Sequence, residues 1–195
     1  MPGGAMATSC LGCGQLQSER RNLSRPGKLL RLLQLRRSSI EGGANTPRLK
    51  SFHYMNNILA KRELSAAGAG PGVEGLFLNG SGHVCEGTVS NVFWLMNGAL
   101  YAPSPETGAL PGITRAYVQE MAAEAGMLVQ EGCYDFDQLA QADEVFLTNS
   151  VQEIVPVTAL ADEQGTVLRE FPEAGSATRA WMRQYRLRAE RGEHG

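Results

Sequence analysis

Lys50 is the first residue of the chain whose type and setting could support catalysis. It opens the stretch KSFHYMNNILAKRE (residues 50–63), in which aromatic and amide side chains give way to an amphipathic pattern. A lysine is usually exposed to solvent. A lysine held between apolar neighbours instead has a lowered pKa, and its neutral amine can form a Schiff base with an aldehyde cofactor. Spacing alone leaves both interpretations open.

Glu86 is the second candidate, a carboxylate between two predicted strands in HVCEGTVSNVF (residues 83–93). Carboxylates in such positions are commonly solvated turn residues. Pyridoxal phosphate would give this one a catalytic role. The ring nitrogen of that cofactor must stay protonated for the ring to accept electrons, and a buried carboxylate beside it stabilises the proton.

The third candidate is LPGITR (residues 110–115), where strand-like sequence gives way to a helical pattern. A helix N-terminus offers unpaired backbone N–H groups and a partial positive charge, which together favour a phosphate. Gly112 permits close approach of the backbone, and Thr114 adds a hydroxyl. The same letters are also typical of a Pro-Gly turn in which Thr114 only caps the helix.

A hydroxyl-rich turn at residues 148–150 follows the apolar run EVFL and contains Ser150. Turns of this kind commonly satisfy their own backbone groups. Ser150 gains a binding role only if the fold brings this turn beside the same phosphate.

The elements that must position these residues follow from the apolar spacing. A helix is predicted after Lys50 as far as Gly68, and another from Thr114 to Gly126. Between them, Asn-Gly and Ser-Gly pairs separate short apolar runs and predict hairpins, because a type I′ turn needs positive φ at both central residues. The rest of the chain predicts a short helix near residues 135–141, strands at 144–148 and 154–157, and a last helix around Trp181. The expected fold class is α+β, with a mixed or antiparallel sheet core and flanking helices.

Composition narrows the class of protein. The 195 residues are 43% hydrophobic with a net charge of −2, as in globular domains. No apolar run reaches the roughly 18 to 20 residues that span a bilayer, and the start lacks a secretory signal, so we expect no membrane contact and a cytoplasmic location.

Nine of the 18 basic residues lie in residues 1–50, a segment without aromatic residues for base stacking, so we expect no nucleic-acid partner. The single CxxC pair lacks a second pair, so we expect no metal site.

Four collinear segments together resemble the class IV family of pyridoxal-phosphate enzymes, which includes branched-chain and D-amino-acid transaminases and aminodeoxychorismate lyase. They run in order from residue 49 over most of the chain and are LKSFHYMNNILAKRE, EGTVSNVFW, LPGITR and ADEVFLTNSVQEIVPV. The resemblance implies the large C-terminal lobe of the D-amino-acid-transaminase-like fold. It also implies pyridoxal 5′-phosphate as cofactor, a small amino compound as substrate and a homodimer.

By this resemblance Lys50 is the catalytic residue, which binds the cofactor covalently and shuttles protons. Glu86 matches the partner of the pyridine nitrogen. The other implied cofactor-binding residues shape the wall beside the ring or bind the phosphate, and they are Leu110, Gly112, Ile113, Thr114 and Ser150.

The segments KSFHYMNNILAKREL and YAPSPETGALPGITR look most like aminodeoxychorismate lyases. Such lyases eliminate pyruvate from 4-amino-4-deoxychorismate and leave 4-aminobenzoate for folate synthesis. A branched-chain or D-amino-acid transaminase of the same family is an alternative, because the shared motifs bind cofactor and do not settle the substrate.

Family members carry a smaller lobe ahead of the lysine, and residues 1–48 do not resemble it. We therefore expect residues 1–48 to be an atypical basic segment, disordered or left over from the interlobe region. Residues 49–195 are expected to form the cofactor-binding large lobe. A chain without the smaller lobe would be weakly active, or would survive as a non-catalytic binding or dimerisation module.

Overall fold

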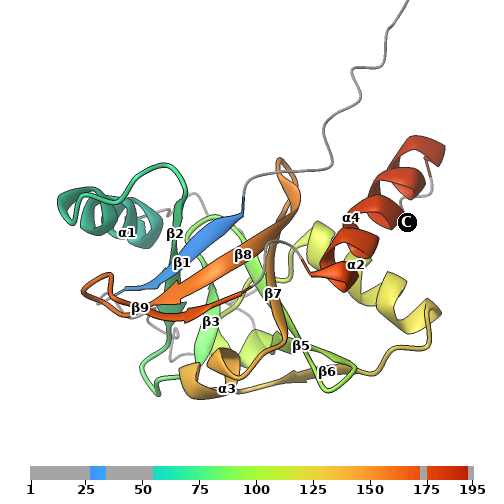
Figure 1. Cartoon of the computed structure of the whole chain (residues 1–195), viewed down its shortest axis with the longest axis horizontal. Helices are drawn as coiled ribbons and strands as arrows, with labels where there is room; N and C mark the ends of the chain where they lie inside the picture. The colour runs from blue at the N-terminus through green and yellow to red at the C-terminus, as the bar shows by residue number, and fades with distance from the viewer. Residues whose placement is uncertain (1–26, 34–54, 172–174, 193–195) are drawn as a thin grey trace, which may run out of the picture.

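The computed structural model describes residues 27–33, 55–171 and 175–192. Lys50 lies outside these ranges. Most of the predicted N-terminal segment 1–48 also lies outside them, because only residues 27–33 of that segment are described. The described strands form one mixed sheet in the order β3-β2-β1-β8-β7-β4-β5-β6, and β9 pairs with β8. Helices flank this sheet (Figure 1), which confirms the α+β class.

The strands are β1 (Lys28–Leu32), β2 (Val73–Leu78), β3 (Val84–Gly87), β4 (Asn91–Met96), β5 (Ala99–Pro103), β6 (Val129–Gly132), β7 (Glu144–Asn149), β8 (Glu153–Ala161) and β9 (Val167–Glu170). The helices are α1 (Met55–Ala66), the 3-10 turn η1 (Pro105–Thr107), α2 (Ile113–Glu124), α3 (Phe136–Ala140) and α4 (Ser176–Arg191). Among the described residues, no helix is long and apolar enough to cross a membrane.

Strand β1 lies in the middle of the sheet, parallel to both β2 and β8. Its central side chain, Leu30, is fully buried. Two neighbouring strands satisfy its backbone hydrogen bonds, which an isolated short stretch of this sequence could not do for itself. Part of the basic segment 1–48 is therefore built into the sheet of the lobe, while the domain division at residue 48 stays a prediction.

The Asn-Gly signal correctly predicts the turn between β4 and β5, which pair antiparallel. Asn97 and Gly98 both have positive φ, at 51° and 75°. The turn between β2 and β3 is built differently, because the Asn79 side chain accepts hydrogen bonds from the N–H groups of Ser81 and His83 at 2.9 and 3.0 Å. One Asn-Gly pair thus forms the predicted turn with positive φ, and the other turn is held by its own asparagine side chain.

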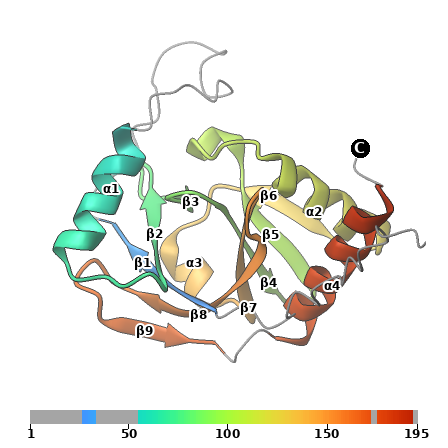
Figure 2. The same cartoon turned by 90° about the horizontal axis from the view of Figure 1, so that it is seen from above.

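Helix α1 lies at one end of the molecule, and α2 and α4 lie together at the other (Figures 1 and 2). Helix α1 packs on β2 through Ala60 and Leu64. The apolar residues whose spacing predicts this helix, Met55, Ile58 and Leu59, are instead exposed. Helices α2 and α4 share a core with β4, β5, β7 and β8, to which Trp181 of the predicted last helix contributes.

Candidate functional site

A cavity of about 250 Å³ lies where four separate segments meet. Its walls come from Asn57 of α1, residues 86–91 from the end of β3 to the start of β4, residues 110–114 at the start of α2, and residues 148–150 at the end of β7. Seen from above, α1 and α2 stand on opposite sides of the strands that bear these segments (Figure 2). The predicted non-lysine site residues all line this one cavity, and they are Glu86, Leu110, Gly112, Ile113, Thr114 and Ser150.

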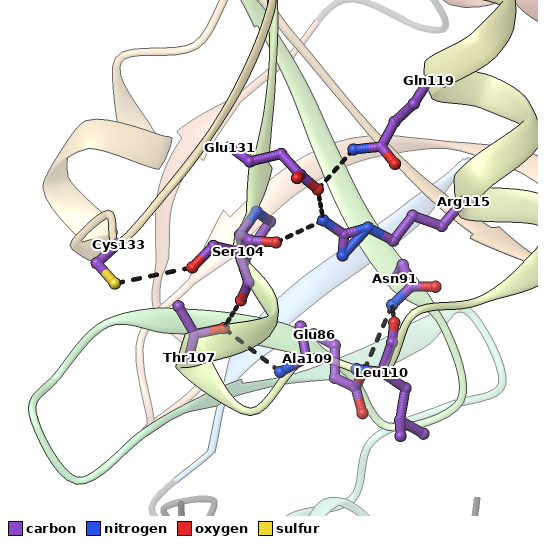
Figure 3. Close-up of polar contacts among 11 residues, drawn as sticks. Glu86, Asn91, Ser104, Thr107, Ala109, Leu110, Arg115, Gln119, Glu131 and Cys133 are labelled. Atoms are coloured by element: carbon purple, nitrogen blue, oxygen red, sulfur yellow. Dashed lines mark hydrogen bonds and ion pairs between the residues drawn. The ribbon is translucent and has the colours of Figure 1, made fainter. Parts of the chain in front are cut away.

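Glu86 is a buried carboxylate with only 4% of its surface exposed. Its Oε2 accepts a hydrogen bond from the Leu110 N–H at 2.7 Å and a longer one, at 3.4 Å, from the Asn91 side-chain amide. The same amide donates to the Leu110 carbonyl at 2.8 Å, so the three residues form a closed arrangement (Figure 3). The hydrogen bonds among Glu86, Asn91 and Leu110 therefore hold the carboxylate in one orientation.

Helix α2 begins with Gly112 as its N-cap, and no side chain caps its first backbone N–H groups. Thr114 is thus a buried first-turn residue, and the interpretation of Thr114 as the helix cap is wrong. Uncapped N–H groups and the positive end of the helix dipole both favour an anion. Because Ile113 and Thr114 line the cavity, this end of α2 can receive a phosphate there.

Arg115 fixes the first turn of α2 to the sheet. Its buried guanidinium donates to the Pro103 carbonyl at 2.8 Å and pairs with Glu131, which Gln119 also contacts at 2.7 Å (Figure 3). A cation in the first turn of a helix opposes the helix dipole. A basic residue at this position therefore indicates a compensating acidic partner, and the sequence prediction assigned no role to Arg115.

The turn at residues 149–153 forms the last wall. The Asn149 side chain accepts hydrogen bonds from the N–H groups of Val151 and Gln152, at 2.9 and 2.6 Å. Glu153 adopts a positive φ of 59° and is held by the Arg186 guanidinium of α4 at 3.1 Å. This turn presents Ser150 at the cavity with its side chain exposed.

Thr148 contributes a buried hydroxyl to the wall of the cavity. Its side chain is 1% exposed and lines the cavity, yet its hydroxyl has no hydrogen-bond partner among the described residues. A buried polar group without a partner costs free energy, so such groups are rare and usually meet a ligand or water. The sequence places Thr148 in the candidate turn at residues 148–150 but indicates a binding role only for Ser150, and Asn57 and Asn91 were not predicted to belong to the site. In the described part of the chain, no group of three or more His, Cys, Asp or Glu side chains could hold a metal.

We predict that Gly112→Ala weakens ligand binding at this cavity without unfolding the protein. A Cβ at position 112 would lie 2.4 Å from the Asn91 Oδ1, so Asn91 must move and release both Leu110 and Glu86. Pyridoxal phosphate titrated against the purified variant should show at least a tenfold weaker Kd, about 1.4 kcal/mol. Gly70→Ala is the control, because a Cβ there meets nothing within 4 Å. Equal affinity in both variants would contradict the role given to Asn91.

Comparison with known proteins gives a consistent picture. The family model for class IV amino-transferases matches residues 14–160. The aminodeoxychorismate lyase of Bacillus subtilis (strain 168) is 41% identical over 172 residues, which cover 88% of this chain and 54% of that relative. The chain thus spans about half the length of the curated relatives it matches.

Two solved structures have the same fold. A protein of Legionella pneumophila, provisionally described as a 4-amino-4-deoxychorismate lyase, superposes with a TM-score of 0.71 at 32% identity over 84% of this chain and 57% of its own. The branched-chain aminotransferase of Thermobaculum terrenum, solved in its pyridoxal-phosphate form, gives a TM-score of 0.69 at 31% identity over 82% of this chain and 50% of its own.

Proposed function

The chain belongs to the class IV aminotransferase family, and from that premise we propose that it is the cofactor-binding lobe of a 4-amino-4-deoxychorismate lyase. Enzymes of this family depend on pyridoxal phosphate. The observation that carries the lyase proposal is the 41% identity to the Bacillus subtilis lyase, because that alignment extends over nearly nine-tenths of the chain.

The described residues fit pyridoxal phosphate at the cavity. The uncapped start of α2 at Ile113 and Thr114 suits the phosphate, and the buried Glu86 carboxylate suits the ring nitrogen. The Thr148 hydroxyl, which lines the same cavity and has no hydrogen-bond partner among the described residues, supports a polar ligand at this place. When bound, this cofactor supplies an electron sink for the electrons released as a proton leaves the substrate.

In the proposed reaction, Lys50 removes a ring proton from the substrate and returns one to the departing enolpyruvyl group. The bond between the ring and the enolpyruvyl oxygen breaks, pyruvate leaves, and the ring becomes aromatic 4-aminobenzoate. Glu86, held by Leu110 and Asn91, would accept a hydrogen bond from the protonated ring nitrogen of the bound cofactor. No amino acceptor enters this scheme.

The test is turnover of 4-amino-4-deoxychorismate by the purified chain supplied with pyridoxal phosphate. We expect 4-aminobenzoate and pyruvate in equal amounts, without any added 2-oxo acid. The chain spans about half of its relatives, so a low rate is expected. Absence of 4-aminobenzoate above the background of a boiled sample would reject the lyase proposal.

A branched-chain aminotransferase is the second candidate, favoured by the close structural similarity to the Thermobaculum terrenum enzyme. This alternative requires a 2-oxo acid to accept the amino group, whereas the lyase does not. Incubating the loaded protein with a branched-chain amino acid, with and without a 2-oxo acid, separates the two. Amino-group transfer that depends on the 2-oxo acid, in a protein that forms no 4-aminobenzoate, would favour the aminotransferase.

We further propose that the lobe comprises residues 49–195 together with β1, that the full protein is a homodimer and that it is cytoplasmic. The docking of β1 between β2 and β8 supports its inclusion in the lobe. The homodimer is proposed from the family resemblance, and the cytoplasmic location from the lack of a membrane-spanning apolar run and of a secretory signal in the sequence. Sedimentation of the purified protein tests the homodimer, and fractionation of cells that express the protein tests the cytoplasmic location.

A further inference from the structure

Lys28 of β1 connects two parts of the molecule that lie far apart in the sequence. Its Nζ donates to Glu74 Oε2 at 2.9 Å and to Gln152 Oε1 at 3.0 Å. The ion pair is enclosed, with 14% of the Lys28 side chain and 4% of the Glu74 side chain exposed. Because each partner comes from a separate strand or turn, these contacts exist only when β1 is docked in the sheet.

Glu74 carries this contact to one wall of the cavity. Its second oxygen, Oε1, accepts hydrogen bonds from the Thr88 hydroxyl at 3.1 Å, the Val89 N–H at 3.0 Å and the Ser90 hydroxyl at 3.1 Å. All three residues line the cavity, whereas Glu74 does not. One buried carboxylate therefore binds every residue of the turn at residues 88–90 through a hydrogen bond.

Gln152 extends the hydrogen-bond network of Lys28 to a second wall of the cavity. It belongs to the turn at residues 149–153, where its own N–H donates to the Asn149 side chain at 2.6 Å. That turn presents Ser150 to the cavity. Lys28 thus ties the 88–90 turn, through Glu74, to the 149–153 turn, through Gln152.

We propose that Lys28 and Glu74 are positioning residues that fix the spacing of these two turns and so set the affinity of the cavity for pyridoxal phosphate. The inference rests on the proposed function for its ligand. Neither residue lines the cavity, so they act through the two turns. Removing one member of a buried pair leaves an uncompensated charge, which the turns must move to solvate.

The first experiment compares Lys28→Met with Arg31→Met in the 195-residue chain. Both residues lie on β1 and make long-range hydrogen bonds, but Arg31 donates to the Glu163 carbonyl at 2.7 Å, in the turn between β8 and β9. Both variants should lower the midpoint of thermal unfolding. Only Lys28→Met should weaken the Kd for pyridoxal phosphate, by about tenfold. A wild-type Kd in Lys28→Met would overturn the inference.

The double variant Lys28→Met with Glu74→Gln separates positioning from stability. It removes both charges, so its unfolding midpoint should recover relative to Lys28→Met. The Kd should stay about tenfold weaker than that of the wild type, because the bridge between the turns is still absent. Recovery of both quantities would mean that the pair only neutralises charge, and the positioning role would be rejected.

A ligand-free measurement keeps this inference apart from the proposed function. In the nuclear magnetic resonance spectrum of the unliganded protein, Gln152→Met should shift the amide signal of Val89, and should not do so in a Lys28→Met background. If Gln152→Met in the wild-type background leaves the chemical shift of the Val89 amide unchanged, the inference is overturned. If the wild type binds no pyridoxal phosphate while this coupling is present, the proposed function fails and the coupling of the turns stands.

Discussion

Replacing Lys50 with alanine should abolish the visible absorption band that pyridoxal phosphate acquires on binding to this protein. Glu86 and the residues at the start of α2 line one cavity, and we propose from the family resemblance that Lys50 is the amine that binds the cofactor. Without that amine, the phosphate contacts can still hold the cofactor, so Kd should weaken while covalent attachment is lost completely. Absorption spectra and borohydride reduction followed by mass measurement report attachment directly.

Lys61→Ala is the matched control for Lys50→Ala. Lys61 is an exposed lysine of α1, eleven positions further along the same sequence stretch. It should keep the full absorption band and full covalent attachment. If Lys50→Ala also kept them, Lys50 would be an ordinary solvated lysine, and the assignment of the catalytic amine would be wrong whatever the activity.

Local sequence signals predicted much of the site because each depends on few neighbours. Asn97 and Gly98 form the predicted turn with positive φ, as a type I′ hairpin turn requires. The start of α2 was predicted from the change of period at LPGITR. The cavity then brings Glu86, this helix start and Ser150 together, as the collinear motifs imply.

Non-local pairing explains what the sequence did not predict. Strand β1 forms because it pairs with β2 on one side and β8 on the other. The sequence of Lys28–Leu32 alone does not predict this pairing, because both partner strands are distant in the chain. Strand β9 pairs with the preceding strand β8 across a short turn, and it was missed because its four exposed residues show no alternation of apolar and polar side chains. The roles of Lys28 and Arg115 depend on partners that only the fold supplies, Glu74 for one and Glu131 for the other.

Glu86→Gln should leave the fold and cofactor binding nearly intact while lowering turnover by about 100- to 1000-fold, the usual loss when one preorganised electrostatic group is removed. A glutamine has the same shape, and its carbonyl oxygen can still accept the Leu110 N–H that now lies 2.7 Å from Glu86. It carries no charge, so it cannot hold the proton on the ring nitrogen of the cofactor. Kd, kcat and the unfolding midpoint should be measured on the same preparation.

The absorption spectrum gives a second result for Glu86→Gln that does not depend on the substrate. Without a carboxylate beside it, the ring nitrogen has a lower pKa, because an opposite charge no longer favours its protonated form. The visible band of the bound cofactor should therefore change with pH near neutrality in the variant and stay constant in the wild type.

Glu144→Gln is the control for Glu86→Gln. Glu144 also accepts a backbone N–H, that of Thr178 at 2.8 Å, but it holds the start of α4 and does not line the cavity. This variant should lose stability and keep wild-type turnover and spectrum. Should Glu86→Gln behave in the same way, with a constant spectrum and unchanged kcat, the buried carboxylate would serve only to hold Leu110 in place. The ring nitrogen would then need a different partner from the one that the sequence indicates.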